Sequence, residues 1–311
     1  MALTPLITRT PPATDLTAHI GNTPLVPVTG LDGVPESVTV LGKAEWLNPG
    51  GSVKDRAAWA IIRAAEASGA LAGGRTLLDA TSGNTGIAYA WIGAARGIPV
   101  TLCVPANANA ERKRVLAALG AELVFSDAMA GTDGAIREAR RLALEEPGRL
   151  VHLDQYSNPA NWRAHFTGTA MEIWRQTGGR VTHLVAGIGT SGTLVGTARR
   201  LKQLEPRILA VAVQPDGPYH ALEGLKHLPS AMVPAIYDPL AHDRTLAVAS
   251  EEAIAMTKRQ VRHGLMLGWS AGAALVAAER VARELEHGVV VAVLPDGAER
   301  YLDEPLWEGG A

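Results

Sequence analysis

The sequence has a single cysteine among 311 residues, almost no net charge and no long apolar run. Cys103 on its own excludes an internal disulfide and any zinc or iron–sulfur site built from several cysteines, which fits a protein of the reducing cytoplasm. A net charge of −2 offers no general basic surface to nucleic acid or to an anionic membrane. A membrane span needs about 20 apolar residues, and the chain shows neither such a run nor a secretory signal pattern.

Apolar side chains are plentiful enough to form a large core, with 47% hydrophobic and 19% charged residues. At about 150 residues per domain, the length corresponds to roughly two domains. Short apolar segments bounded by Gly and Pro alternate with amphipathic segments, the pattern of parallel strands covered by helices on both faces. We therefore predict an α/β protein with two doubly wound three-layer domains, mainly parallel sheets and a crevice between them.

The same periodicity predicts the individual elements. Strands are expected at Val38–Ala44, Thr76–Ala80, Val100–Val104, Glu122–Phe125, Thr182–Ala186, Ile208–Val213 and Val289–Leu294. Helices are expected at Val53–Ser68, Gly86–Arg96, Glu111–Leu119, Asp133–Glu145, Leu194–Leu204, Glu251–His263 and Ala271–Glu286. The segment Pro215–Asp243 has five prolines and no periodicity, as is typical of a functional loop or a lid.

Lysine is scarce, with six residues against 23 arginines, and Lys54 differs in its setting from the others. It follows a Gly50-Gly51 turn and Ser52, a candidate helix cap. In the first turn of a helix the dipole disfavours a cationic amine and lowers its pKa, as a nucleophilic or Schiff-base lysine requires. An ordinary capped helix start is the alternative, and this segment alone slightly favours it.

Three glycine-containing turns lead into predicted helices, and two of them directly follow predicted strands. The turn at Thr81–Gly86 offers backbone amides and hydroxyls that suit a carboxylate or phosphate, although a plain strand-to-helix turn has the same composition. The turn at Gly187–Thr193 matches the G-x-G-x-x-G fingerprint of nicotinamide-dependent oxidoreductases, but its three hydroxyls suit a single terminal phosphate better. The turn at Gly268–Gly272, taken by itself, indicates a helix cap at Ser270.

Six motifs together give the sequence a specific resemblance. They are Ile20–Leu25, Asn48–Arg56, Thr81–Gly86, Gln155–Asn161, Gly187–Thr193 and Gly268–Gly272. In this order they resemble the cysteine synthase (O-acetylserine sulfhydrylase) family of fold-type II pyridoxal-phosphate enzymes, from about Leu16 to Tyr301. The resemblance implies a tryptophan synthase β-like fold, with a smaller mobile domain at 43–152. A larger phosphate-binding domain would comprise 1–42 and 153–311, and the cofactor would lie between the two.

The resemblance also implies residue roles. Lys54 would hold pyridoxal 5′-phosphate as an internal aldimine, Asn84 would bond its ring hydroxyl, and Ser270 would face its pyridine nitrogen. The phosphate would be held by Gly189, Thr190, Ser191, Gly192 and Thr193. The substrate would be bound by Thr81, Ser82, Asn84, Thr85, Gln155 and Gly224. A neutral serine opposite the pyridine nitrogen weakens the electron sink and suits prompt β-elimination.

The implied activity is a ping-pong β-replacement that makes L-cysteine from O-acetylserine and sulfide through an aminoacrylate, with Lys54 as general base. The enzyme would be a cytoplasmic homodimer that acts on small molecules, without a metal, a nucleic acid or a membrane partner. O-phosphoserine or a thiocarboxylate as reactant, and thiol addition of the cystathionine β-synthase type, stay open as alternatives. Two hypotheses from other functional classes are a nicotinamide-dependent oxidoreductase and a non-catalytic relative. The oxidoreductase hypothesis leaves Asn48–Arg56 unexplained, and the presence of Lys54 argues against a non-catalytic relative.

Several positions depart from the family pattern or lack an assigned role. Ser191 stands where glycine is common, and Trp269 replaces a small residue and is expected to pack. Lys226 and His227 lie in the most divergent stretch, where they would meet an anionic group or, as we favour, face solvent. The histidines show no metal-ligand spacing, and Cys103 is interpreted as a small buried hydrophobe.

Overall fold

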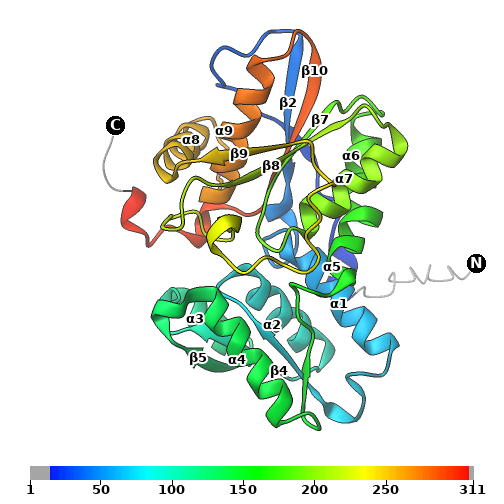
Figure 1. Cartoon of the computed structure of the whole chain (residues 1–311), viewed down its shortest axis with the longest axis vertical. Coiled ribbons are helices and arrows are strands. Elements are labelled where there is room, and N and C mark those ends of the chain that lie inside the picture. The colour runs from blue at the N-terminus through cyan, green and yellow to red at the C-terminus, as the bar shows by residue number, and fades with distance from the viewer. Residues whose placement is uncertain (1–14, 308–311) are drawn as a thin grey trace, which may run out of the picture.

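The computed structural model describes residues 15–307 and contains two sheets, one below the other in the view of Figure 1. The six-stranded sheet has the order β1-β2-β10-β7-β8-β9, and the four-stranded sheet has the order β5-β4-β3-β6. All neighbouring strands run parallel except β1 and β2. The strands are β1 (Leu25–Pro27), β2 (Val38–Ala44), β3 (Thr76–Ala80), β4 (Val100–Pro105), β5 (Glu122–Ser126), β6 (Leu150–His152), β7 (His183–Gly187), β8 (Leu209–Pro215), β9 (Arg244–Val248) and β10 (Gly288–Leu294).

Helices cover both faces of each sheet, because successive strand residues point to opposite sides. In β7, Leu184 and Ala186 pack against α6 and α7, whereas Val185 packs with α8 and α9. In the smaller sheet, Leu77 packs with α1 and α2, whereas Leu78 packs against α4. The helices are α1 (Lys54–Ala67), α2 (Asn84–Arg96), α3 (Ala110–Ala118), α4 (Gly131–Glu145), α5 (Pro159–Ala164), α6 (Ala170–Gln176), α7 (Gly192–Leu204), α8 (Ser250–Arg262) and α9 (Trp269–Arg283).

The predicted α/β architecture with two three-layer units is confirmed, and each predicted strand and helix is present with shifts of a few residues at its ends. The sequence pattern missed β1, β6, β9 and the helical stretch from α5 through the π-helical turn His165–Thr169 to α6. The predicted domain division at 43 falls inside β2, which pairs with β10 up to Ala44. That division stays a prediction.

The predicted irregular segment is also found. Between Pro215 and Asp243 the structure contains a single short 3-10 turn, Leu228–Ser230. Residues 218–231 of this segment line a cavity between the sheets, so the loop contributes directly to the candidate site. Within the described residues, the model has no helix with both the length and the apolar character needed to cross a membrane.

Candidate active site

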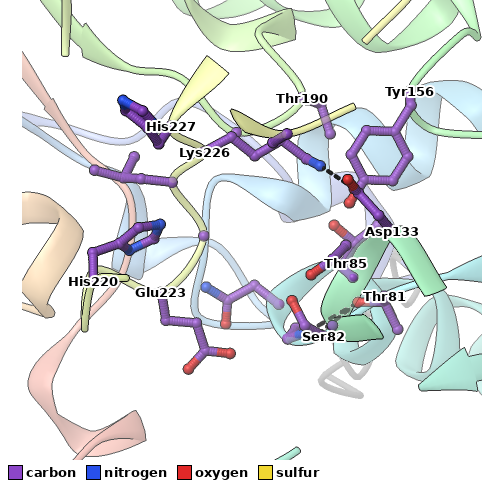
Figure 2. Close-up of a pocket in the computed structure, with 18 of the residues that line it drawn as sticks. Thr81, Ser82, Thr85, Asp133, Tyr156, Thr190, His220, Glu223, Lys226 and His227 are labelled. Carbon is purple, nitrogen blue, oxygen red and sulfur yellow. Dashed lines mark hydrogen bonds and ion pairs between the residues drawn. The ribbon is translucent and has the colours of Figure 1, made fainter. Parts of the chain in front are cut away.

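A cavity of about 530 Å³ lies where the carboxyl ends of strands from both sheets converge (Figure 2). This edge is where parallel α/β sheets bind their ligands. A smaller pocket shares Lys54, Asn84 and Gly189 with the cavity and reaches Ser270. The predicted site residues other than Gly192 line one of the two spaces. Lys54, Thr81, Ser82, Asn84, Thr85, Gln155, Gly189, Thr190 and Gly224 line the cavity, and Ser191, Thr193 and Ser270 line the smaller pocket. Gly192 lines neither space and begins α7 directly after Ser191.

Lys54 is the first residue of α1, and its side chain opens into both spaces. Ser52 Oγ accepts a hydrogen bond from the Lys54 backbone N–H at 3.3 Å, although Val53, not Ser52, occupies the cap position of α1. Burial lowers the pKa of the Lys54 amine, and the carboxylate of Asp296 acts in the opposite direction. The amine makes no hydrogen bond or ion pair with the residues that the structure describes, so it is available to react.

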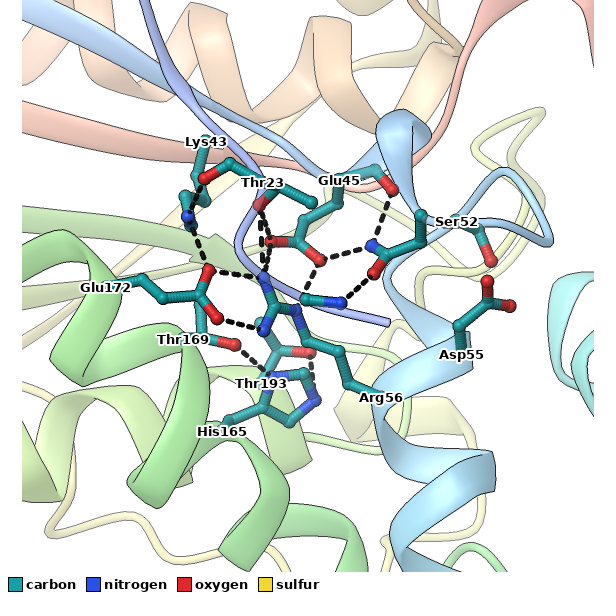
Figure 3. A network of polar contacts seen from close by, with 12 residues as sticks. Thr23, Lys43, Glu45, Ser52, Asp55, Arg56, His165, Thr169, Glu172 and Thr193 are labelled. Carbon is teal, nitrogen blue, oxygen red and sulfur yellow. Dashed lines mark hydrogen bonds and ion pairs between the residues drawn. The ribbon is translucent and has the colours of Figure 1, made fainter. Parts of the chain in front are cut away.

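The start of α1 is held by a buried ionic network (Figure 3). Arg56 bonds Glu45 on one side and Glu172 on the other, with N–O distances of 2.7 Å in both cases. Lys43 Nζ lies 2.7 Å from the second oxygen of Glu172. Arg56 and Lys43 hold the pKa of Glu172 down at about 2. The network ties β2, α1 and α6 together and fixes the direction from which Lys54 enters the cavity.

The turn after β3 forms one wall of the cavity. Thr81 Oγ1 accepts hydrogen bonds from the N–H groups of Gly83 and Gly86, at 3.1 and 3.0 Å, and so shapes the turn before α2. Thr85 donates to Gln155 Oε1 at 2.8 Å, and the Gln155 amide donates to the Ala80 carbonyl at 2.8 Å. These bonds hold the turn and Gln155 in one rigid unit with hydroxyls and amides near the cavity.

The turn after β7 leads into α7 and has the shape of an anion cradle. Asn161 Nδ2 donates to Thr190 Oγ1 at 3.0 Å, and the hydroxyl of Thr193 contacts His165 Nε2 at 3.3 Å. A Cβ at position 192 would lie 2.0 Å from Asn161 Oδ1, which explains the glycine there. Ser191 has φ of 71°, a left-handed conformation that favours glycine.

The residues present fit a phosphorylated pyridine aldehyde. Asn84 Oδ1 and Ser191 Oγ are buried and have no hydrogen-bond partner among the described residues, although buried polar groups normally have one. They line the same pocket as the reactive amine of Lys54 and the hydroxyl of Ser270. An amine, a neutral hydroxyl and an amide-rich turn at a helix N-terminus supply the groups that such a cofactor needs.

The irregular segment closes the cavity from the opposite side, and here one prediction is wrong. Lys226 is 9% exposed; its Nζ lies 2.7 Å from Asp133 Oδ1 and above the ring of Tyr156 (Figure 2). It therefore does not face solvent, because the cavity wall buries its stem and Asp133 balances its charge. His227 is half-buried and bonds Ser230 within its own turn. Glu223, next to Gly224, pairs with Arg112 of α3.

The remaining sequence predictions concern packing. Trp269 packs as expected, 1% exposed against Tyr301 and Trp307, with its Nε1 donating to Glu304. Cys103 is fully buried, and burial raises the pKa of its thiol to about 12. His165 is buried, and burial lowers its pKa to about 3. Within residues 15–307 no group of three or more His, Cys, Asp or Glu is arranged to hold a metal ion.

Sequence reasoning missed Asp296, Tyr301 and Arg112. Asp296 follows β10 and accepts hydrogen bonds from Asn84 Nδ2 at 2.7 Å and from the Tyr301 hydroxyl at 2.5 Å. Arg112 lies over the Tyr301 ring and donates to the carbonyl of Ser82. The position of Asp296 just beyond a predicted parallel strand was the signal that marked it, since that edge of a sheet gathers ligand-binding side chains.

Comparisons with known proteins show which proteins this chain is similar to. Residues 16–296 match the family model described as pyridoxal-phosphate dependent enzyme. A cysteine synthase of Aquifex aeolicus is 49% identical over 93% of this chain and 90% of its own length. A cysteine synthase B of Pseudomonas aeruginosa is 42% identical over 93% and 96%. The crystal structure of a cysteine synthase from Entamoeba histolytica superimposes with a TM-score of 0.91 and 32% identity, covering 100% of this chain and 95% of that one.

Proposed function

The chain belongs to the pyridoxal-phosphate dependent enzymes, within their cysteine synthases, and from that premise we propose that it makes L-cysteine from O-acetylserine and sulfide by β-replacement. Its cofactor is pyridoxal phosphate. The observation that carries the proposal is the placement of Lys54, whose side chain is half-buried and opens into both the cavity and the pocket that reaches Ser270, and whose amine has no partner among the described residues.

Different residues of the site would bind different groups of the cofactor. Bound pyridoxal phosphate supplies electron withdrawal from the α-carbon of an attached amino acid. The turn Gly189–Thr193 would bind the phosphate with the help of the Ser191 hydroxyl, which has no partner in the described part of the chain. Ser270 would meet the pyridine nitrogen as a neutral partner. Asn84 would meet the ring hydroxyl.

The protein's own groups then handle the proton and the substrate. The lowered pKa of Lys54 favours a neutral amine that takes the α-proton of the substrate and later returns it. Ser82 and the rigid unit of Thr81, Thr85 and Gln155 would orient the substrate carboxylate, so that the α-proton points at Lys54. Gly224, at the cavity edge opposite this turn, would let the loop approach the substrate closely.

The alternatives are less well supported. A phosphate leaving group or thiocarboxylate would need a free cation, yet Lys226 is already balanced by Asp133. The nicotinamide hypothesis rested on the glycines of 187–192, and the family assignment accounts for those residues. The protein's likeness to cysteine synthases supports sulfide over a larger thiol as the nucleophile.

The visible absorption spectrum of the purified protein tests the proposal. A cofactor band should be present, should change when O-acetylserine is added and should return when sulfide is added. The change should require lower concentrations of O-acetylserine than of O-phosphoserine. Absence of a band after incubation with pyridoxal phosphate, or a band indifferent to both esters, would contradict it.

Further proposals concern the assembly. We propose a cytoplasmic homodimer that acts on small molecules and binds no nucleic acid, in which residues 43–152 move relative to 1–42 and 153–311. The net charge of −2 and the buried Cys103 support a cytoplasmic protein that binds no nucleic acid. The location of β3 to β6 within 76–152 supports the division into two domains. Light scattering on the purified protein should give twice the chain mass of 32.6 kDa.

A further inference from the structure

A buried carboxylate lies at the junction of three elements of the site. Asp296 is 1% exposed and lies two residues beyond the end of β10. Its backbone forms an isolated antiparallel bridge with Ser52, and the N–H of Val53 donates to the Pro295 carbonyl at 2.8 Å. These backbone contacts place the Asp296 carboxylate beside the first turn of α1, the helix that begins at Lys54.

The carboxylate determines how the amide of Asn84 is turned. A carboxylate oxygen only accepts hydrogen bonds, so the Asn84 group that lies 2.7 Å from Asp296 Oδ2 has to be the NH₂. The amide oxygen, Oδ1, is left buried and without a partner among the described residues. Leaving such an atom unpaired is unfavourable, and a group of a ligand in the adjoining pocket would relieve this cost.

One further hydrogen bond holds the carboxylate itself. The Tyr301 hydroxyl donates to Asp296 Oδ2 at 2.5 Å. A Cβ at Gly268 would lie 2.2 Å from Asp296 Oδ1, so glycine at this position leaves the carboxylate its space. The charged groups around the pair are Lys54 on α1, Arg112 on α3 and Arg300 after β10.

Building on the proposed function, we propose that Asp296 is a positioning residue of the reaction, which acts by holding Asn84 so that the Asn84 amide oxygen faces the cofactor ring beside Lys54. The same carboxylate places a negative charge near the Lys54 nitrogen and favours its protonated form. Asp296, which lies after β10, thus links two groups of the site that begin different helices and lie 30 residues apart in the sequence (54 and 84).

The test compares cofactor-loaded wild type with Asp296→Asn, Tyr301→Phe and Asn84→Ala. Two quantities are measured: the rate of cofactor release after dilution, and the pH midpoint of the visible band of the bound cofactor. Asp296→Asn should release the cofactor about ten-fold faster, since the amide of Asn84 is no longer fixed. Its midpoint should fall by about one pH unit or more, because the negative charge that favours the protonated nitrogen is gone. Tyr301→Phe retains the charge and should leave the midpoint unchanged.

A double variant separates positioning from a general structural effect. In the Asn84→Ala background, Asp296→Asn should not accelerate release further, while the fall in the midpoint should persist. Independent, multiplicative effects on release would overturn the proposal, and so would a single Asp296→Asn variant that matches wild type. If Asp296→Asn fails to fold, Asp296→Glu replaces it and should release the cofactor faster with little change in the pH midpoint. A release rate of Asp296→Glu equal to that of wild type would overturn the proposal. A wild-type protein without a visible band contradicts the proposed function itself, whereas a normal band with no response to Asp296→Asn contradicts the positioning role alone.

Discussion

At the residue scale, the chemistry of the proposed reaction depends on the setting of a single amine. Lys54 is kept free of carboxylate partners at hydrogen-bond distance within the described residues, while burial lowers its pKa. These two features are not sufficient for a reactive lysine, because the amine also needs a neighbouring wall that binds the substrate. The turn 81–85 and the pocket that reaches Ser270 supply that wall on two sides.

Replacing Lys54 by Ala should therefore abolish turnover and leave the fold intact. We expect a loss of activity of more than about a thousand-fold, because the variant lacks both the covalent anchor and the base. The measurement is the rate of cysteine formation, with circular dichroism to verify folding. Lys113→Ala is the matched control, since this α3 amine bonds the Ala106 carbonyl and lies over the Phe125 ring, and Lys113 does not line the cavity. Normal turnover in Lys54→Ala would refute the assigned role.

Ser191 combines a strained backbone with a hydroxyl that has no hydrogen-bond partner within residues 15–307, and two substitutions separate these features. Both Ser191→Gly and Ser191→Ala remove the hydroxyl, and both should weaken cofactor binding about ten-fold if it bonds the phosphate. The glycine variant should be about 1 kcal/mol more stable than the alanine variant, because φ is 71°. Urea unfolding and cofactor titration measure the two effects. Equal stabilities would show that the left-handed conformation carries no strain.

The candidate site was predictable from the sequence where neighbouring residues form it. Asn48–Arg56, Thr81–Gly86 and Gly187–Thr193 are local turns, so their composition reveals them. Lys226 was misjudged because its partner Asp133 is 93 positions away, and Asp296 was missed because its partner Asn84 is 212 positions away. Pairings at such distances depend on how the strands and helices pack, and no local pattern encodes them.

At the element scale, β2, α1 and α6 are held together by charges that are removed from water. Arg56 and Lys43 together neutralise Glu172 and Glu45, and all four side chains are nearly inaccessible to solvent. Taking ions out of water is costly, and it is the mutual pairing that offsets this cost. Loss of any one partner would therefore leave an uncompensated charge next to the helix that begins with Lys54.

Glu172→Gln should destabilise the protein by about 3 kcal/mol at neutral pH, measured by urea unfolding. Because folding lowers the pKa of Glu172 from 4.5 to about 2, its contribution is complete above pH 4.5. The contribution is lost as the pH falls through about 2, so the difference between wild type and variant should shrink over that interval. Glu205→Gln is the control: its carboxylate also has a pKa of about 2, but it pairs at the surface with Arg207. The change in the free energy of unfolding of this control should be too small to measure. A pH-independent Glu172→Gln difference would contradict the argument.

The elements that escaped prediction are short or exposed. β6 has three residues, too few for a period-two pattern to be recognised. β9 is an edge strand whose residues are mostly exposed, so its apolar alternation is weak. The helical stretch at 159–176 is broken by a π-helical turn at His165–Thr169, where the helical period is interrupted. The long regular helices and buried strands, in contrast, follow directly from their periodicity.

At the scale of the whole molecule, two ion pairs join the irregular segment to the opposite wall of the cavity. Glu223 reaches Arg112 on α3, and Lys226 reaches Asp133 on α4. Both partners on the opposite wall belong to helices that cover the four-stranded sheet, whereas the segment itself connects β8 to β9 of the six-stranded sheet. The pairs therefore connect the two units across the cavity.

Reversing one charge of this connection and then both tests the idea. Lys226→Asp places two carboxylates face to face, so the loop should open, the KM for O-acetylserine should rise several-fold and proteolysis within 218–231 should accelerate. The combined variant Lys226→Asp with Asp133→Lys rebuilds the pair in the opposite sense and should restore most of the KM and the protease resistance. High salt should mimic part of the single-variant effect in wild type, because the pair is partly exposed. If the combined variant instead stays as impaired as Lys226→Asp alone, Lys226 acts on the substrate directly and the pair does not serve closure.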